Sequence, residues 1–170
     1  MLAWPYGTPK VMSSYDWSSQ QGTSAGTPTP TNDQGQTLPV SCGDGWVCEH
    51  RWPGIANMVE FRNVTQGVAT VDYWWDNGNN QIAFARGDRG FVAINNENTD
   101  LSQTLMTGLP PGTYCNVLSL PPNGVHPEDG RLEPTLASCE TELIEVDAFG
   151  NANIEVPPYQ SLALHIEAQL

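Results

Sequence analysis

The stretch Trp75-Asp-Asn-Gly-Asn-Asn-Gln-Ile-Ala-Phe-Ala-Arg-Gly-Asp-Arg-Gly-Phe91 decides how the larger part of this chain folds. It contains Asn77-Gly78, a dipeptide that strongly favours a tight turn between two antiparallel strands. The flanking runs, Val68–Trp75 and Gln81–Ala85, are rich in the apolar and aromatic residues typical of strands. The stretch therefore predicts a β-hairpin, and the pattern becomes all-β from about residue 68 onward.

Short strand-forming runs continue to the end of the chain, separated by turn signals such as Gly108-Leu-Pro-Pro-Gly112 and Pro157-Pro158. About eight short strands at this spacing predict an antiparallel Greek-key β-sandwich or barrel over residues 68–170. After the hairpin, strands are expected at Gly90–Asn95, Gln103–Met106, Thr113–Leu118, Glu142–Val146, Asn153–Val156 and Leu162–Glu167.

Residues 1–67 follow a different pattern. Lys10–Ser14 is expected to form one short, mostly buried strand, and residues 17–41 to form a long loop rich in Ser, Thr, Gly, Pro and Gln. Pro53 suits the first turn of a helix, and apolar residues recur at helical spacing after it, so a helix is predicted over residues 53–64. One strand, one loop and one helix do not make a domain, so they are interpreted as the last βα unit of a larger α/β structure.

Acidic side chains dominate the charge of the chain. It has 19 Asp and Glu residues against 6 Lys and Arg residues, a formal net charge of −13. Nucleic acids and anionic membrane surfaces attract clustered Lys and Arg, so the composition argues against both as partners. No apolar run approaches the ~20 residues of a transmembrane helix.

Four cysteines stand at positions 42, 48, 115 and 139. An even number in an acidic, tryptophan-rich chain fits two disulfides and an exported protein, and the obvious pairing is local, Cys42 with Cys48 and Cys115 with Cys139. A zinc site made of Cys42, Cys48 and His50 is the alternative, although no fourth ligand is obvious. The N-terminus has no basic segment followed by a long apolar run, so a signal peptide is expected to have been removed or to lie in a missing N-terminal part.

Several segments together resemble α-amylases of the animal type, which also occur in actinomycetes and marine bacteria. They follow one another in the same order and cover most of the chain, which makes the resemblance more specific than any single motif. The segments are Ala3-Trp-Pro-Tyr-Gly7, Val11-Met-Ser-Ser-Tyr15, Trp46-Val-Cys-Glu-His-Arg-Trp52, Asn57-Met-Val-Glu-Phe-Arg-Asn63, the hairpin stretch quoted above and Thr107-Gly-Leu-Pro-Pro-Gly-Thr-Tyr-Cys115.

The resemblance implies a division of the chain. Residues 1–67 would be the end of the catalytic (β/α)₈ barrel, with strand eight, its loop and helix eight, and residues 68–170 the C-terminal antiparallel β-domain. The family places disulfides where Cys42–Cys48 and Cys115–Cys139 stand. The implied function is part of a secreted α-amylase, which hydrolyses internal α-1,4-glucosidic bonds in starch and glycogen with retention of configuration by means of two carboxylates.

The resemblance also implies what this chain does not supply. In the family the three catalytic carboxylates lie on earlier barrel strands, and the calcium ligands come earlier too, so no catalytic residue and no metal ligand is expected here. The calcium ion belongs to the full-length enzyme, and the isolated chain is expected to be inactive. The expected partners are the missing N-terminal barrel portion and, through the whole enzyme, the α-glucan substrate.

Lys10 is the only lysine of the chain and falls in a run of apolar and small residues. A buried cation needs an anion, so a structural ion pair with a barrel carboxylate is one reading, and a side chain that extends to solvent is another. Chloride-dependent α-amylases carry Arg or Lys at this position. The resemblance therefore implies that Lys10 is a chloride ligand, within a site whose other ligands lie outside this chain.

Aromatic residues suggest two further places of interest. Trp17 lies in the loop after the expected strand eight, and such loops rise from the catalytic face of (β/α)₈ barrels, so Trp17 is a possible sugar-stacking residue of the substrate cleft. In the run Tyr73, Trp74 and Trp75, alternation puts Trp74 on one face and its neighbours on the other, and core packing is favoured over a sugar platform. Two other functions stay open for the chain, a free-standing carbohydrate-binding module and a purely structural β-domain.

Overall fold

The computed structural model describes residues 1–15, 32–36, 38–39, 42–43, 45–119, 139 and 142–170. In this part of the chain eight strands form two antiparallel sheets and one α-helix precedes them. The elements are α1 (Pro53–Val64), β1 (Asp72–Asp76), β2 (Gln81–Arg86), β3 (Gly90–Asn95), β4 (Leu101–Met106), β5 (Gly112–Cys115), β6 (Leu143–Val146), β7 (Asn151–Val156) and β8 (Ser161–His165).

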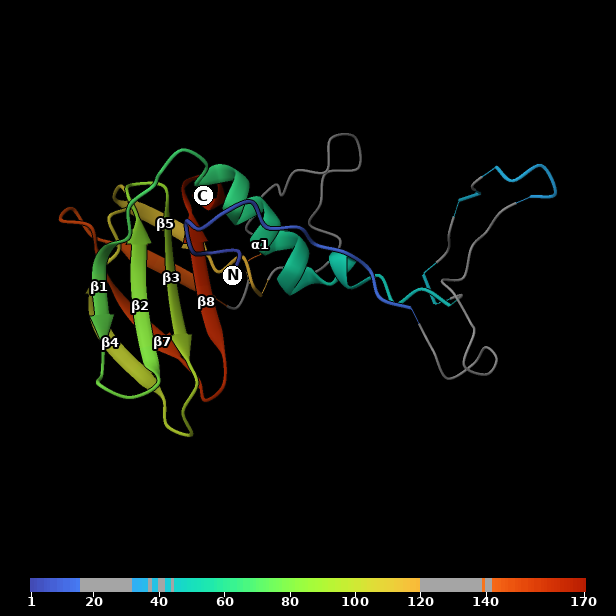
Figure 1. Cartoon of the computed structure of the whole chain (residues 1–170). Helices are drawn as coiled ribbons and strands as arrows, with labels where there is room; N and C mark the ends of the chain where they lie inside the picture. The colour runs from blue at the N-terminus through green and yellow to red at the C-terminus, as the bar shows by residue number, and fades with distance from the viewer. Residues whose placement is uncertain (16–31, 37, 40–41, 44, 120–138, 140–141) are drawn as a thin grey trace.

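The two sheets pack face to face as a sandwich. The first has the strand order β1-β2-β3-β8 and the second β4-β7-β6-β5, and Figure 1 shows the first lying across strands of the second. In the second sheet the chain runs through β5 and β6 to β7, which pairs with β4, and this is a Greek-key order. The predicted antiparallel β-sandwich is therefore confirmed, and the open choice between sandwich and barrel falls to the sandwich.

The turn between β1 and β2 forms at the predicted dipeptide. Gly78 has a φ of 79°, a left-handed conformation that glycine adopts without strain. The Gly78 amide donates to Asp76 Oδ1 at 2.9 Å, and the Asn79 amide donates to Asn77 Oδ1 at 2.9 Å. Short polar side chains thus satisfy the turn backbone locally, and this fixes where the two strands begin to pair.

The main core lies between the sheets, where alternate residues of each strand meet. Inward positions on β2 and β3 are small or aromatic, while those on β4, β7 and β8 are mostly branched aliphatics. The buried set is Ala83, Ala85, Phe91, Ala93, Leu101, Leu105, Leu109, Tyr114, Val146, Ala152, Ile154, Val156, Leu162 and Leu164.

Helix α1 packs against the β8 side of the first sheet, near one end of that strand (Figure 1). Phe61 is fully buried and belongs to a second apolar cluster with Phe84, Val92 and Ala163. Gly90 permits the close approach, because a Cβ there would lie 2.7 Å from Phe61 Cε2. The helix has the predicted bounds.

The N-terminal residues do not form the expected strand. In the described chain residues 10–14 have no strand, and only Tyr15 makes an isolated bridge, to Trp46. A strand exists only where a neighbour accepts its ladder hydrogen bonds, and no described strand lies alongside this run. The division of the chain at residue 67 stays a prediction.

Two arginines attach the first residues to the sandwich and the helix. Arg86, on the outer face of β2, is 2% exposed and donates from Nη1 to the carbonyl of Ala3 at 2.6 Å. Arg62 of α1 donates to the carbonyls of Trp4 and Gly7. Residues 3–7 are therefore held by side-chain contacts to carbonyl oxygens, without belonging to either sheet.

Candidate functional site

Lys10 is exposed, which corrects the expectation that it sits in a mostly buried strand. It makes no hydrogen bond or ion pair with another described residue. Hydrogen bonds to another segment begin three residues later, where the Ser13 hydroxyl accepts from the Cys48 amide at 2.7 Å and the Val47 amide donates to the Ser14 carbonyl at 2.9 Å. No other described residue therefore joins Lys10 in an anion-binding site, and the chloride role of Lys10 stays a prediction.

Glu49 also connects the segment around Ser14 to the segment around Cys48. Its carboxylate accepts from the Ser14 hydroxyl and, at 2.8 Å, from the Ser14 amide. These bonds favour the charged form, so they hold the pKa of Glu49 below its usual value. The carboxylate is therefore used in tying residues 13–15 to the segment around Cys48.

Both expected cysteine pairs lie at disulfide distance. The Cα atoms are 5.6 Å apart in Cys42–Cys48 and 5.5 Å apart in Cys115–Cys139, within the range that a disulfide spans. Because Cys42 and Cys48 use their sulfur atoms in this bond, no thiolate is left for the alternative zinc site with His50. Trp17 and most of its loop lie outside the described residues.

Strand β1 contains a bulge that the alternation rule did not predict. Asp72 pairs with Ala85 and Trp75 pairs with Ala83, so β1 carries one more residue than β2 over this interval. Tyr73 takes up the extra length with a φ of 52°, a left-handed backbone that is uncommon for a bulky residue. The bulge separates the three aromatic side chains into different environments.

Trp75 and Trp74 pack on opposite faces of the first sheet. Trp75 is partly buried against the core between the sheets. Trp74 stacks on Phe84 of the outer face with ring centroids 6.0 Å apart, and Trp4 meets both rings edge-on. The Trp74 indole nitrogen also donates to Asp76 Oδ2 at 2.7 Å. The core packing expected for the run applies to Trp75, while Trp74 is still 49% exposed at the surface.

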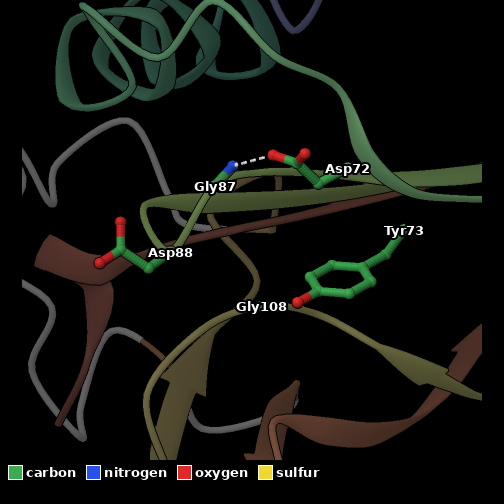
Figure 2. A pocket seen from close by; sticks show the side chains of 5 residues that line it. All are labelled: Asp72, Tyr73, Gly87, Asp88 and Gly108. Atoms are coloured by element: carbon green, nitrogen blue, oxygen red, sulfur yellow. Dashed lines mark hydrogen bonds between the residues drawn. The ribbon is translucent and has the colours of Figure 1, made fainter.

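Tyr73 lies on the rim of a surface pocket of about 310 Å³, lined by Asp72, Tyr73, Gly87, Asp88 and Gly108. Figure 2 shows the Tyr73 ring along one side and Asp88 across from it with its carboxylate directed away from the ring, and it shows the backbone of Gly87 and Gly108 between them. The pocket therefore joins three separate parts of the chain: β1, the β2–β3 turn and the β4–β5 connection.

Backbone geometry keeps this pocket open. Gly108 has a φ of 73°, and a Cβ there would lie 2.5 Å from the carbonyl oxygen of Gly87 and 3.1 Å from Tyr73 Cε2. The Gly87 amide donates to Asp72 Oδ2 at 3.1 Å, which orients that carboxylate (Figure 2). The sequence did not predict this site, because its lining residues come from three separate parts of the chain.

No three His, Cys, Asp or Glu side chains among the described residues gather closely enough to hold a metal ion. The helix in the described part of the chain is too short and too polar to cross a membrane.

A family profile and the sequence relatives of this chain both point to the α-amylases. The profile described as the α-amylase C-terminal all-β domain matches residues 74–167. The α-amylase of Oryzias latipes is 44% identical over 185 residues, which takes in 100% of this chain and 33% of the relative. Pancreatic alpha-amylase 2a5 of Mus musculus is 52% identical over 131 residues, with 70% of this chain and 25% of the relative covered.

Solved structures agree with the sequence relatives. Wild-type α-amylase I of Eisenia fetida superimposes with a TM-score of 0.71 at 42% identity, over 97% of this chain and 33% of that one. A variant of the same enzyme in complex with maltohexaose gives a TM-score of 0.72 at 41% identity. The chain spans about a third of the length of the curated relatives it matches. It belongs to the α-amylase family, with residues 74–167 matching the C-terminal all-β domain of these glycoside hydrolases.

Proposed function

We propose that this chain works as the C-terminal part of a secreted α-amylase, which hydrolyses internal α-1,4-glucosidic bonds of starch and glycogen with retention of configuration. The observation that supports this most strongly is the similarity to an animal α-amylase along 100% of the chain. The cysteine pairs support secretion, because disulfides persist in oxidising compartments.

The catalytic carboxylates are assigned to a portion of the enzyme outside this chain. A retaining glycosidase needs a general acid whose pKa is raised, beside a carboxylate nucleophile. The carboxyl groups with shifted pKa values among the described residues all have lowered ones: Glu49, Glu97 and Asp147. Hydrogen bonds to the charged form cause each shift, chiefly from Ser14, Asn77 and Asn151 respectively.

The isolated chain is expected to release no reducing sugar from soluble starch above the buffer blank. The physical reason is that both carboxylates of the double displacement are assigned to the portion of the enzyme outside this chain. The measurement is a reducing-end assay over several hours with the disulfides intact. Hydrolysis by the purified chain, lost when one of its own carboxylates is mutated, would contradict the assignment of catalysis to another portion.

We further propose Lys10 as one ligand of the chloride ion of the whole enzyme, together with a calcium ion whose ligands lie outside this chain. Lys10 fits an anion site only in part, because it offers one ammonium donor and no described residue supports it. When bound, a chloride ion would supply a fixed negative charge, and the role of Lys10 is to hold it. Trp17, in the loop that follows, is proposed as a wall of the substrate cleft.

Chloride dependence tests the role of Lys10. The enzyme is rebuilt by fusing this chain behind the part of the Oryzias latipes α-amylase that it does not match. Starch hydrolysis by this fusion is expected to rise with added chloride, and Lys10→Gln is expected to abolish the rise. Arg51→Gln is the control, since Arg51 is also an exposed cation of the N-terminal part. An equal chloride response in the Lys10 variant and its parent would overturn the role.

A further inference from the structure

We propose that the pocket on β1 binds a short segment of α-glucan, with the Tyr73 ring as its stacking surface and the carboxylate of Asp72 as a hydrogen-bond acceptor. The choice of α-glucan as ligand rests on the proposed function. The binding site itself rests on the geometry of residues within this chain.

The ring of Tyr73 is presented to solvent by the bulge in β1. Its side chain is 55% exposed and lines the pocket, whereas Trp75, two residues on, packs into the core. Bulges commonly redirect a side chain next to a functional site. An exposed aromatic face held beside a pocket suits the apolar C–H face of a sugar ring, as other flat apolar groups stack on aromatics.

The polar groups around the ring are mainly acceptors. Asp72 uses Oδ2 for the Gly87 amide and, at 2.8 Å, for the Thr70 hydroxyl. Asp88 is exposed, and its carboxylate points away from the Tyr73 ring (Figure 2). A carboxylate accepts hydrogen bonds and cannot donate them when ionised, so the Asp72 side of the pocket suits a ligand that donates.

A neutral sugar meets these requirements better than an anionic ligand. None of the residues that line the pocket is basic, so a phosphate or carboxylate group would meet only like charge from Asp72 and Asp88. Adjacent hydroxyl groups of a glucose unit offer several donors and carry no charge. The volume of about 310 Å³ lies at the lower end of ordinary ligand pockets, which limits the bound segment to a few sugar units.

The test is a titration of the full chain with maltoheptaose, followed by NMR of the backbone amides. Binding is expected with a Kd of about 1 mM, since one half-exposed ring and a few hydrogen bonds carry it. The largest shifts are expected at the amides of Gly87, Asp88 and Gly108. Tyr73→Ala is expected to weaken binding about tenfold, and Tyr73→Phe, which keeps the ring, to retain it.

Tyr159 provides the matched control. It is an exposed tyrosine with a φ of 59°, so it shares the backbone conformation of Tyr73 but does not line the pocket. Tyr159→Ala is expected to bind maltoheptaose as the parent does. Thermal unfolding of each variant shows that the fold is kept, and the amide shifts of the parent give the site even if Tyr73→Ala unfolds.

Three outcomes overturn the inference: no saturable amide shift with maltoheptaose, shifts that map away from Gly87 and Gly108, or saturation of the pocket by a divalent cation while the glucan has no effect. The proposed function can fail separately. If a fusion with the Oryzias latipes enzyme hydrolyses starch but the chain does not bind maltoheptaose, the proposed function stands and the binding site is ruled out. If the chain binds maltoheptaose but the fusion does not hydrolyse starch, the binding site stands and the proposed function fails.

Discussion

Replacing Arg86 with methionine is expected to lower the free energy of unfolding by about 2 to 4 kcal/mol, because it leaves buried carbonyl acceptors without their charged donor. Arg86 is 2% exposed and serves three carbonyl groups: Ala3 at 2.6 Å, Val68 at 2.5 Å and Thr65 at 3.4 Å. Ala3 belongs to the N-terminal segment, Val68 to the link that leads to β1, and Thr65 directly follows α1.

Burial is the main cause that lowers the pKa of Arg86, and the charge of Arg62 adds to it. Arginine nevertheless stays protonated in proteins, so the guanidinium remains a charged donor at this junction. Methionine keeps most of the side-chain length and supplies no donor. The loss should therefore come from the unpaired carbonyls and from freer motion of residues 3–7.

Urea unfolding followed by tryptophan fluorescence measures the change, and hydrogen exchange locates it. Faster exchange is expected at the amides of residues 65–68, close to the lost contacts, with little change in β7. Arg51→Met is the control, because Arg51 is exposed. A loss below about 0.5 kcal/mol in the Arg86 variant would show that these contacts do not hold the layers together.

The second large effect is a loss of stability in acid that is traced to His165. This side chain is 1% exposed, and neither ring nitrogen has a hydrogen-bond partner among the described residues. Burial lowers the pKa of His165 to about 4. An exposed histidine, as in the unfolded chain, has a pKa of about 6.5. Between that pH and about 4 the unfolded state therefore binds a proton at His165 and the folded state does not.

Stability is therefore expected to fall as the pH drops from about 6.5 to about 4, by about 3 kcal/mol from this group alone. His165→Leu should remove that part of the pH dependence. At pH 7 it should leave stability equal or higher, since it replaces an unpaired buried polar ring with an apolar side chain. Urea unfolding at several pH values measures both effects.

His50→Gln is the control for the His165 variant, because His50 is exposed. It should keep the pH dependence of the parent. Carboxylates contribute their own losses in acid in every variant, so the comparison between the two histidine variants isolates the buried ring. An unchanged acid slope in His165→Leu would contradict the effect.

The parts of the fold that local chemistry specifies were predictable. The β1–β2 turn forms at Asn77-Gly78 because short polar side chains of the turn itself close it, and Glu97 from the β3–β4 connection accepts two further hydrogen bonds there. Helix α1 keeps its predicted bounds because Pro53 starts it and one of its faces, centred on Phe61, is buried. Strand ends were less accurate, since β5 stops at Cys115 where a strand to Leu118 was expected.

The parts that depend on distant neighbours were not predictable. Apolar residues after Lys10 have strand character, but a strand needs a paired neighbour, and Lys10 is exposed in a segment without one. The bulge at Tyr73 arises from the register between β1 and β2, which alternation along one strand cannot show. The pocket brings Asp72, Asp88 and Gly108 together through three loops and strands, so no single motif signals it.

The most direct test of the proposed enzyme role is starch cleavage by the fusion of this chain with the unmatched part of the Oryzias latipes α-amylase. The fusion should remove the blue iodine colour of starch before much reducing sugar appears, which shows internal cleavage. Proton NMR of the first products should show the α-anomer, which shows retention. A folded fusion that leaves starch intact, or that releases the β-anomer first, would contradict the role.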